Sequence, residues 1–394
     1  MTSALLFTYG LLALFTAVNG LRRPSPPTSR FPALWLPAML VGEAPYLFLI
    51  GRTLITGALV MAGGLALPMG NLGLAAVGIA QLLQLEVIRR ALVAARRARV
   101  TPVVASWWER LTSWPYHLPS GVERLDDLEY APGLRTDLYR TRLGSSPSLR
   151  PALIYVHGGS WGGGDPRRQF RTITHHLAAQ GWVVVTIRYP FSPAATFPEH
   201  LVAVNRAIHW ARTEGRAYGI DPQQIAIAGG SAGAHLAALA ALGNGSQQPG
   251  FEEADTSVAA AVVLYGIYDF FNRNRVRYDW PVIPKRVMKA PPTEAEELYR
   301  QASPIDQVHA GAPPFLVVHG THDSLVPPGE SVHFVEALQR AGASAEYLPV
   351  HGAQHAFDVL GGIRTRVLAR QIKLFLDQSL STRHHPPTEG IMEA

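Results

Sequence analysis

The fold of this chain is decided by residues 226–236, which read AIAGGSAGAHL. An apolar β-prone run ends there in Gly-Gly-Ser-Ala-Gly and continues into residues rich in alanine and leucine, which predicts a strand, a sharp turn and a helix. The glycines that flank Ser231 permit a turn too tight for a side chain. Such a turn would hold the serine hydroxyl at the end of the strand, so Ser231 is a candidate nucleophile.

Short apolar runs and amphipathic stretches alternate around this turn. β-Branched runs bounded by Gly and Pro predict strands, and apolar residues three and four apart predict helices. The predicted strands are 134–140, 152–156, 182–188, 224–228, 258–265, 315–319 and 344–349, and the predicted helices are 170–180, 199–214, 234–242 and 330–341. This order indicates an α/β fold whose mostly parallel central sheet is flanked by helices, with ligands bound beyond the carboxyl ends of the strands.

A serine hydroxyl needs a base to take its proton, and that base needs a carboxylate to orient it. Two loops downstream of Ser231 offer such partners. Asp323 follows the predicted strand 315–319, and His355 follows the predicted strand 344–349. We therefore predict that Asp323 and His355 act with Ser231. The alternatives for the two roles are Asp269, Asp306, His351 and His322.

A second glycine-rich loop, residues 157–164, follows the predicted strand 152–156. Glycine N–H groups can approach a substrate oxygen closely, and the N–H of Ala232, directly after the serine, is the other expected oxyanion donor. We expect His157 to brace this loop rather than to transfer protons. A phosphate cradle is disfavoured because no Gly-Lys-Ser/Thr follows the glycines.

The composition excludes several other chemistries. The chain has no cysteine, which rules out disulfides, thiolate metal sites and a cysteine nucleophile, and we predict no cofactor and no bound metal. The formal net charge of +6 comes almost entirely from arginine, and much of the excess lies in residues 22–99 beside apolar segments. That arrangement favours membrane topology over nucleic-acid binding.

Three long apolar runs, 3–18, 46–67 and 72–88, predict a multi-pass membrane region with about three transmembrane helices. The first run lacks the positive start of a cleaved signal peptide, so we expect a retained helix. Two clusters of arginine flank the second and third runs, one at 22, 23 and 30 and the other at 89, 90, 96, 97 and 99. Both clusters can be cytoplasmic only if an even number of spans separates them. We therefore expect an outside N-terminus and a catalytic domain on the cytoplasmic face; buried soluble helices are the alternative.

The chain divides into four predicted parts. These are a membrane region at 1–99, an amphipathic aromatic linker at 100–121, an α/β catalytic domain at 122–380 and a disordered tail at 381–394. The linker contains Trp107, Trp108, Trp114 and Tyr116 and is either an interfacial belt or a packing seam. Residues 271–303 interrupt the α/β pattern and are a candidate partial cap over the site.

With these motifs in view, residues 125–378 resemble the α/β-hydrolase superfamily, in the carboxylesterase/lipase branch that includes hormone-sensitive-lipase-like bacterial esterases and acetyl-ester and feruloyl-esterase-like domains. The resemblance rests on His-Gly-Gly-x-Trp at 157–161, Arg-Tyr at 188–189, Phe-Pro at 197–198, Asp-Pro at 221–222, Gly-Gly-Ser-Ala-Gly at 229–233, Pro-Pro at 313–314, His-Gly-Thr-x-Asp at 319–323 and His-Ala-Phe at 355–357. Ser160 and Gly230 stand where a third glycine and an acidic residue are frequent, which favours the His-Gly-Gly-x-Trp subgroup.

The resemblance implies a Ser231–His355–Asp323 triad and an oxyanion hole from Gly158, Gly159 and Ala232. The residues expected to line the pocket or support the loops are His157, Ser160, Trp161 and Gly230. We expect a membrane-anchored serine carboxylic-ester hydrolase that acts through an acyl-enzyme on short- to medium-chain or lipid-like esters. The expected partners are an ester substrate and membrane lipid, and no nucleic acid. An amidase or formamidase, a prenylcysteine-type methylesterase and a non-catalytic membrane-tethered binding protein are the alternatives.

Overall fold

The computed structural model describes residues 1–22, 34–98, 100–112, 118–142, 148–243, 247–277 and 281–384. The chain forms two compact units. The helical unit contains Met1–His117, His319–Pro328 and Pro349–Leu368, and the sheet unit contains Leu118–Val318, Gly329–Leu348 and Ala369–Ala394. We describe each unit by itself.

The sheet unit is built around an eight-stranded sheet in the order β1-β2-β4-β3-β5-β6-β7-β8. Its strands are β1 (Val122–Ala131), β2 (Leu134–Thr141), β3 (Arg150–Val156), β4 (Val183–Ile187), β5 (Ile220–Gly230), β6 (Ala261–Leu264), β7 (Phe315–Gly320) and β8 (Ala345–Val350). β2 is antiparallel to both β1 and β4, while β4, β3, β5, β6 and β7 pair in parallel. The predicted α/β fold with a mostly parallel sheet is confirmed.

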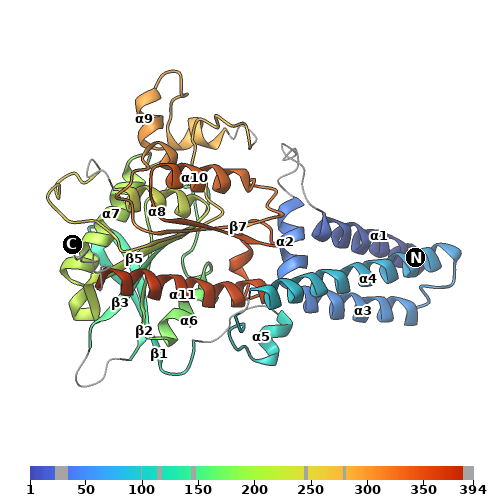
Figure 1. Cartoon of the computed structure of the whole chain (residues 1–394). Coiled ribbons are helices and arrows are strands. Elements are labelled where there is room, and N and C mark those ends of the chain that lie inside the picture. The colour runs from blue at the N-terminus through green and yellow to red at the C-terminus, as the bar shows by residue number, and fades with distance from the viewer. Residues whose placement is uncertain are drawn as a thin grey trace, which may run out of the picture. The chain divides into compact units, whose positions relative to one another are not determined.

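Helices cover both faces of this sheet (Figure 1). α7 (Glu199–Thr213), α8 (Ala232–Leu242) and α10 (Gly329–Arg340) lie on one side, and α6 (Arg171–Ala179) and α11 (Ile363–His384) lie on the other. Every residue of α8 is buried, which its alanine- and leucine-rich composition permits. The indole N–H of Trp182 donates to Asp377 at 3.2 Å and holds α11 beside the start of β4. The smaller helix α9 (Glu296–Gln301) lies within the region predicted as a cap.

All the strands and helices predicted between residues 134 and 349 are present within a few residues of their expected bounds. The sequence does not predict β1 or α11. β1 is an edge strand in which half of the residues are charged and only two of ten are buried, so it lacks the apolar run that marks a buried strand. α11 extends through His384, so residues 381–384, expected in the tail, are helical; residues 385–394 lie outside the described part.

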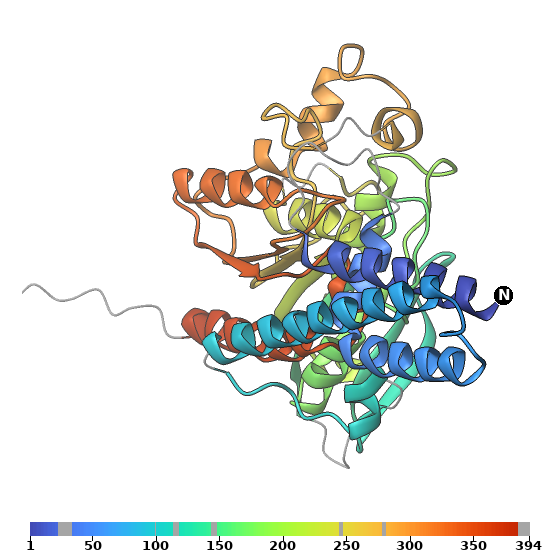
Figure 2. The same cartoon turned by 90° about the vertical axis from the view of Figure 1, so that its right-hand side faces the viewer.

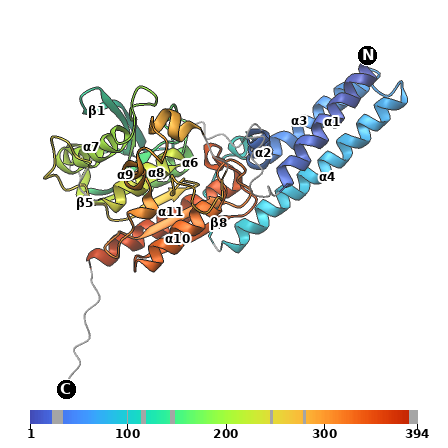
Figure 3. The same ribbon diagram turned by 90° about the horizontal axis from the view of Figure 1, so that it is seen from above.

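The helical unit contains α1 (Thr2–Leu21), α2 (Trp35–Glu43), α3 (Pro45–Met61), α4 (Pro68–Arg97) and α5 (Trp107–Thr112). α1, α3 and α4 run side by side (Figures 2 and 3). α1 and α4 lie so close together at Gly10 that a Cβ on this residue would lie 2.3 Å from the Gly73 carbonyl oxygen. The absence of a side chain at Gly10 therefore permits this approach. Small residues that allow backbones this close are typical of packed membrane helices.

Two of these helices, α1 and α4, are long and apolar enough to cross a membrane. A third span is present if α2 and α3, which meet at a 95° bend, count as one. The one arginine inside the predicted span 46–67 is buried: Arg52 donates to Gln84 at 3.0 Å and to Thr16 at 2.9 Å. Large apolar side chains such as Leu12, Leu54 and Leu82 are more than half exposed, as lipid-facing residues would be. About three membrane spans stays a prediction.

Several predicted features lie outside the described residues: Arg23, Arg30, Arg99, Trp114 and Tyr116. The segments 319–328 and 349–368, expected within the catalytic domain, group instead with the N-terminal helices. One reason is a buried ion pair at 3.0 Å between Arg364 of α11 and Glu43 of α2. Another is a cluster that joins Ala91 and Ala95 of α4 to Ile363 and Val367 of α11.

Candidate active site

Ser231 occupies a strained turn between β5 and α8. Its φ of 55° and ψ of −120° lie outside the regions that residues with a side chain normally adopt. The turn is held from both sides, because the Ser231 N–H donates to the Leu264 carbonyl at 2.9 Å and its own carbonyl accepts from Ala234 at 2.9 Å and His235 at 3.1 Å. The half-buried side chain therefore follows directly on the carboxyl end of a central strand.

Two glycines near Ser231 are required because neighbouring atoms lie too close to them to leave room for a side chain. A Cβ at Gly233 would lie 2.0 Å from the Val156 carbonyl oxygen, and one at Gly230 would lie 2.8 Å from the Tyr265 hydroxyl. The first contact is with backbone of the neighbouring strand, which has no room to move. Gly233 thus lets α8 start against β3, and Gly230 makes room for the Tyr265 ring.

His157 braces the glycine-rich loop after β3. It is completely buried, its Nδ1–H donates to the Gly158 carbonyl at 2.8 Å, and its ring stacks on Tyr189 with centroids 4.5 Å apart. The Tyr189 hydroxyl donates to the His157 carbonyl at 3.1 Å. Burial lowers the pKa of His157 to about 4, so the ring is neutral at neutral pH and serves as a fixed donor.

The three predicted oxyanion donors differ in their surroundings. The Gly158 N–H donates to the Gln169 side-chain oxygen at 2.7 Å, so it reaches a substrate oxygen only if Gln169 moves. Gly159 is exposed, with a φ of 136°. Ala232 is the first residue of α8, where an N–H lacks an acceptor within its helix and carries part of the positive end of the helix dipole. Gly159 and Ala232 are therefore the better-placed donors, and no sequence motif points to Gln169.

Trp161 supports this loop from within the core of the sheet unit. It is 1% exposed, and its indole N–H donates to His235 Nδ1 at 3.2 Å, while His235 Nε2 donates to the Ala302 carbonyl at 2.7 Å. Burial lowers the pKa of His235 to about 3, which keeps it a neutral acceptor for the indole. Ser160, partly exposed, and Trp161 both have positive φ, at 52° and 57°. Trp161 is thus a support residue, and His235 is its unpredicted partner.

Asp323 and His355 lie together in the helical unit. His355 Nδ1 donates to Asp323 Oδ2 at 2.7 Å, and both residues are buried, at 4% and 1% exposure. The other carboxylate oxygen, Oδ1, accepts from the N–H groups of Leu325 at 2.9 Å and Val326 at 2.8 Å. Because the Nδ1 proton is committed to the carboxylate, Nε2 is the ring nitrogen of His355 that can take up a proton.

His319 is a second imidazole beside this carboxylate, and no catalytic role is predicted for it from the sequence. Its Nε2 lies 3.2 Å from Asp323 Oδ2 and 2.8 Å from the Val326 carbonyl, and the residue is completely buried. Burial by itself raises the pKa of Asp323, but the imidazoles of His355 and His319 outweigh it and lower that pKa to about 2. Asp323 is therefore ionised throughout the physiological range.

The alternative acids have other partners. Asp269 accepts from the N–H groups of Phe271 at 3.0 Å and Arg273 at 2.7 Å, as a turn-forming carboxylate does. Asp306 forms an ion pair with Arg273. Of the alternative bases, His351 is exposed, and its carbonyl accepts from Arg364 at 2.8 Å. In the described part of the chain, no group of three or more His, Asp or Glu side chains is arranged to hold a metal ion.

Two contacts join α2 to the loop that carries His355. Trp35 packs edge-on against the His355 ring, with centroids 6.0 Å apart and planes at 84°. Arg364 donates to Glu43 and to the Gly42 carbonyl, both at 3.0 Å, besides its bond to His351. The N-terminal helices are thereby part of the immediate surroundings of His355.

Comparisons with known proteins identify the family of this chain and several similar esterases. The family model described as BD-FAE matches residues 136–338, which include Ser231 and Asp323. The chain is 40% identical over 261 residues to the probable carboxylic ester hydrolase LipM of Mycobacterium tuberculosis, covering 65% of this chain and 61% of that protein. It is 42% identical over 272 residues to the esterase LipQ of the same organism, covering 66% and 64%. The match thus spans less than two thirds of either relative.

Among solved structures, the chain is similar to the propionate-bound form of esterase Est2 from the planctomycete Thermogutta terrifontis. The TM-score is 0.54 at 27% identity, and the match covers 69% of this chain and 97% of that one.

Proposed function

The chain belongs to the BD-FAE family of α/β-hydrolases, and we propose that it is a membrane-anchored serine carboxylic-ester hydrolase. Ser231 is the nucleophile, His355 the general base and acid, and Asp323 the carboxylate that orients His355. The observation that carries the proposal is the 2.7 Å hydrogen bond between His355 and Asp323, which leaves Nε2 to work as the base. The strained turn at Ser231 supports it, because such a turn exposes the hydroxyl of a nucleophile.

The reaction proceeds in two steps, acylation of Ser231 and hydrolysis of the acyl-enzyme. His355 Nε2 takes the Ser231 proton as the serine oxygen bonds to the ester carbonyl carbon, and the Ala232 and Gly159 N–H groups meet the oxyanion. The imidazolium then gives its proton to the leaving alkoxide oxygen, which departs as the alcohol. Water attacks the acyl-enzyme, His355 takes one of its protons, and that proton returns to Ser231 as the acid leaves.

The sheet topology supports a single reaction centre. Ser231 follows β5, the glycine-rich loop follows β3, and Asp323 follows β7, and these strands are parallel members of one sheet. Parallel strands end at the same edge, where α/β proteins bind their ligands. The similarity to proteins named as ester hydrolases supports an ester as the substrate.

Membrane attachment through α1 and α4 is the second part of the proposal. Both helices meet the length and composition of a membrane span. The arginines that follow α1 and α4 can both be cytoplasmic only if the bent pair α2–α3 supplies a further span between them, and on that basis we propose that the catalytic domain lies on the cytoplasmic face. We propose short- to medium-chain or lipid-like esters as substrates, since residues 271–303 add only short helices over the sheet unit. Reporter fusions after Ala394 test the sidedness: a signal on the outer face contradicts it.

Labelling with a fluorophosphonate probe tests the nucleophile in the full chain, extracted in mild detergent. We expect Ser231→Ala to lose labelling, while Ser257→Ala, which alters an exposed serine of the same unit, labels like the wild type. Equal labelling of the two variants refutes the assignment. Hydrolysis of matched p-nitrophenyl ester and anilide substrates then tests the reaction class, and a faster anilide reaction indicates an amidase instead.

A further inference from the structure

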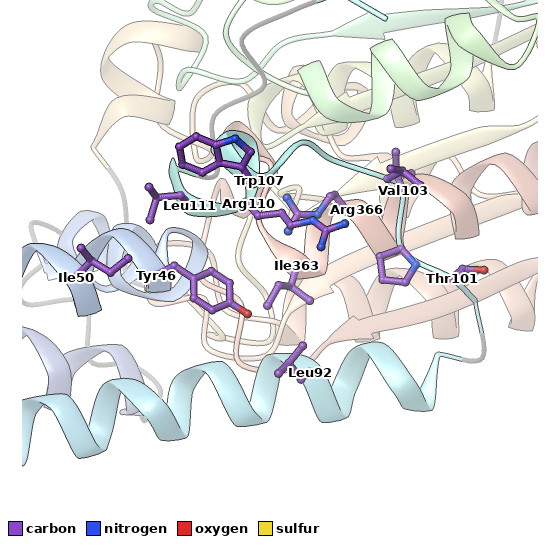
Figure 4. A pocket seen from close by; sticks show the side chains of 12 residues that line it. Tyr46, Ile50, Leu92, Thr101, Val103, Trp107, Arg110, Leu111, Ile363 and Arg366 are labelled. Atoms are coloured by element: carbon purple, nitrogen blue, oxygen red, sulfur yellow. The ribbon is translucent and has the colours of Figure 1, made fainter.

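The helical unit contains a cavity of about 570 Å³ that none of the proposed catalytic residues lines. Its volume lies within the range of roughly 300–1,000 Å³ that small-molecule sites occupy. The lining comes from α3, α4, residues 101–111 and the start of α11, and most of it is apolar (Figure 4). Ile50, Leu92, Leu111 and Ile363 supply aliphatic surface, and Tyr46 adds an aromatic ring with a hydroxyl.

Two arginines face this apolar space. Arg366 is 7% exposed, and its one hydrogen bond from the guanidinium in the described structure goes to the Gly361 carbonyl at 2.5 Å. Arg110 is exposed and donates from Nε to the Ala105 carbonyl at 3.0 Å. Within the described residues neither forms an ion pair, and the nearby Glu109 accepts from Ser106.

The two positive charges act on each other. Burial lowers the pKa of Arg366 and repulsion from Arg110 lowers it further, while attraction to Tyr46, Glu109 and Glu43 opposes this without reversing it. A buried cation without a carboxylate partner is costly, and a second cation beside it adds to that cost. An anion bound between the two guanidinium groups would reduce both the cost of burying the charge and the repulsion between the arginines. Planar guanidinium groups also match the geometry of carboxylate and phosphate oxygens.

The position of the cavity in the helical unit indicates an amphiphile rather than a free ion. Tyr46 and Ile50 lie at the beginning of α3 and Leu92 near the end of α4, so the cavity lies at the arginine-bearing end of these apolar helices. At its edge, Val104 is 83% exposed and Trp107 is 73% exposed. Exposed tryptophans beside an apolar helix end are typical of the membrane–water interface.

We propose that this cavity binds an anionic acyl lipid, with the carboxylate or phosphate of its head group on Arg110 and Arg366 and its acyl chain along Ile50, Leu92 and Leu111. The site is separate from the proposed ester-hydrolysis machinery. The head-group chemistry has two sources, a free fatty acid or an anionic phospholipid of the membrane.

Native mass spectrometry of the full chain in mild detergent tests the proposal with three probes: oleate, dioleoyl phosphatidylglycerol and dioleoyl phosphatidylcholine. We expect oleate, phosphatidylglycerol or both to bind in preference to the zwitterionic phosphatidylcholine. Binding of oleate alone identifies a free fatty acid as the ligand, and binding of phosphatidylglycerol alone identifies a membrane phospholipid. Binding of neither, or equal binding of phosphatidylcholine, overturns the proposal.

Arginine variants test the site itself. Arg366→Gln and Arg110→Gln should each weaken binding of the anionic lipid by about tenfold, because each removes a charge-assisted bond to the head group. The matched control is Arg97→Gln, which removes an exposed charge from the end of α4 outside the cavity and should change the affinity less than about twofold. Equal losses in all three variants indicate general charge attraction and refute the site.

A fourth variant covers the case in which Arg366→Gln does not fold. Leu92→Trp narrows the apolar part of the cavity without changing a charge, and we expect it to weaken anionic-lipid binding while fluorophosphonate labelling of Ser231 stays at the wild-type level. Unchanged lipid binding in both Leu92→Trp and Arg110→Gln refutes the site.

Discussion

The indole of Trp35 lies edge-on against the imidazole of His355, with ring centroids 6.0 Å apart and an interplanar angle of 84°. Trp35 belongs to a helix in the N-terminal region that the sequence predicts as membrane-associated, whereas His355 belongs to the hydrolase motif set. The contact brings α2 against the proposed base, so we expect the orientation of the His355 ring to depend on Trp35. Aromatic pairs of this geometry contribute about 0.5–1.5 kcal/mol beyond the area they bury.

Replacement of Trp35 should therefore slow ester hydrolysis. We expect Trp35→Ala to lower kcat/KM by about 2- to 13-fold, the range that corresponds to that interaction energy, and Trp35→Phe to retain most of the activity. Steady-state hydrolysis of a p-nitrophenyl ester measures this. Trp107→Ala, at an exposed tryptophan of the same unit, is the control and should stay within about twofold of the wild type. Wild-type kinetics for Trp35→Ala contradict a positioning role.

The pKa of Asp323, held at about 2 against 3.8 for a free carboxyl, predicts a specific dependence of stability on pH. A depressed carboxylate pKa stabilises the folded state fully above the unfolded pKa, and this contribution is lost as the pH falls toward the folded pKa. The difference in unfolding temperature between the wild type and Asp323→Asn should thus shrink as the pH falls from about 4 to 2. Thermal unfolding across this range measures it. A gap that does not shrink between pH 4 and pH 2 refutes the assignment.

We expect the Asp323 carboxylate to have a large effect on the rate of ester hydrolysis. Asp323→Asn should reduce kcat on the order of 10⁴-fold, the loss seen when the equivalent carboxylate of a serine protease is replaced, because the wrong imidazole tautomer is then favoured. Asp306→Asn, at the alternative acid that pairs with Arg273, is the control and should keep wild-type kcat. A larger loss of kcat in Asp306→Asn than in Asp323→Asn would assign the orienting carboxylate to Asp306 instead.

Gly233 should tolerate no side chain. A Cβ there would lie 2.0 Å from the Val156 carbonyl oxygen, and neither backbone segment has room to shift, so Gly233→Ala should cost more than about 3 kcal/mol or abolish folding. Gly163→Ala is the matched control, since an added Cβ there meets nothing within 4 Å. Yield of folded protein and chemical unfolding distinguish the two variants. Similar stability of both contradicts the close packing of α8 on β3.

A buried ion pair between Arg277 and Glu330 should be the most sensitive charged contact of the sheet unit. The two groups lie 2.9 Å apart, and Glu330 also accepts from the Tyr268 N–H at 3.0 Å. Removal of one partner leaves a buried charge, so Glu330→Ala should cost about 3–5 kcal/mol of unfolding free energy. Glu296→Ala breaks an exposed pair with Arg300 and should cost under about 0.5 kcal/mol. A small effect at Glu330 would mean that water reaches the pair.

Much of this fold follows from local patterns. Each predicted strand and helix between residues 134 and 349 is present, because the period of the apolar residues reports which face of an element is buried. β1 is not predicted because it is an edge strand with many charged residues and only two buried ones, which leaves no apolar period. The 95° bend between α2 and α3 is not predicted either, since no local sequence pattern specifies the angle between two helices.

Local sequence is enough to predict the strand–turn–helix around Ser231, because the steric demand of a tight turn acts between neighbours along the chain. It also determined that an aspartate and a histidine follow later strands, as the order of the motifs is written in the chain. Which side chains meet follows from the packing of distant segments: His319 lies beside Asp323, Gln169 accepts from the Gly158 N–H, and Arg364 pairs with Glu43, 321 positions away in the chain. Such contacts depend on how distant segments pack, and no local period or propensity encodes that packing.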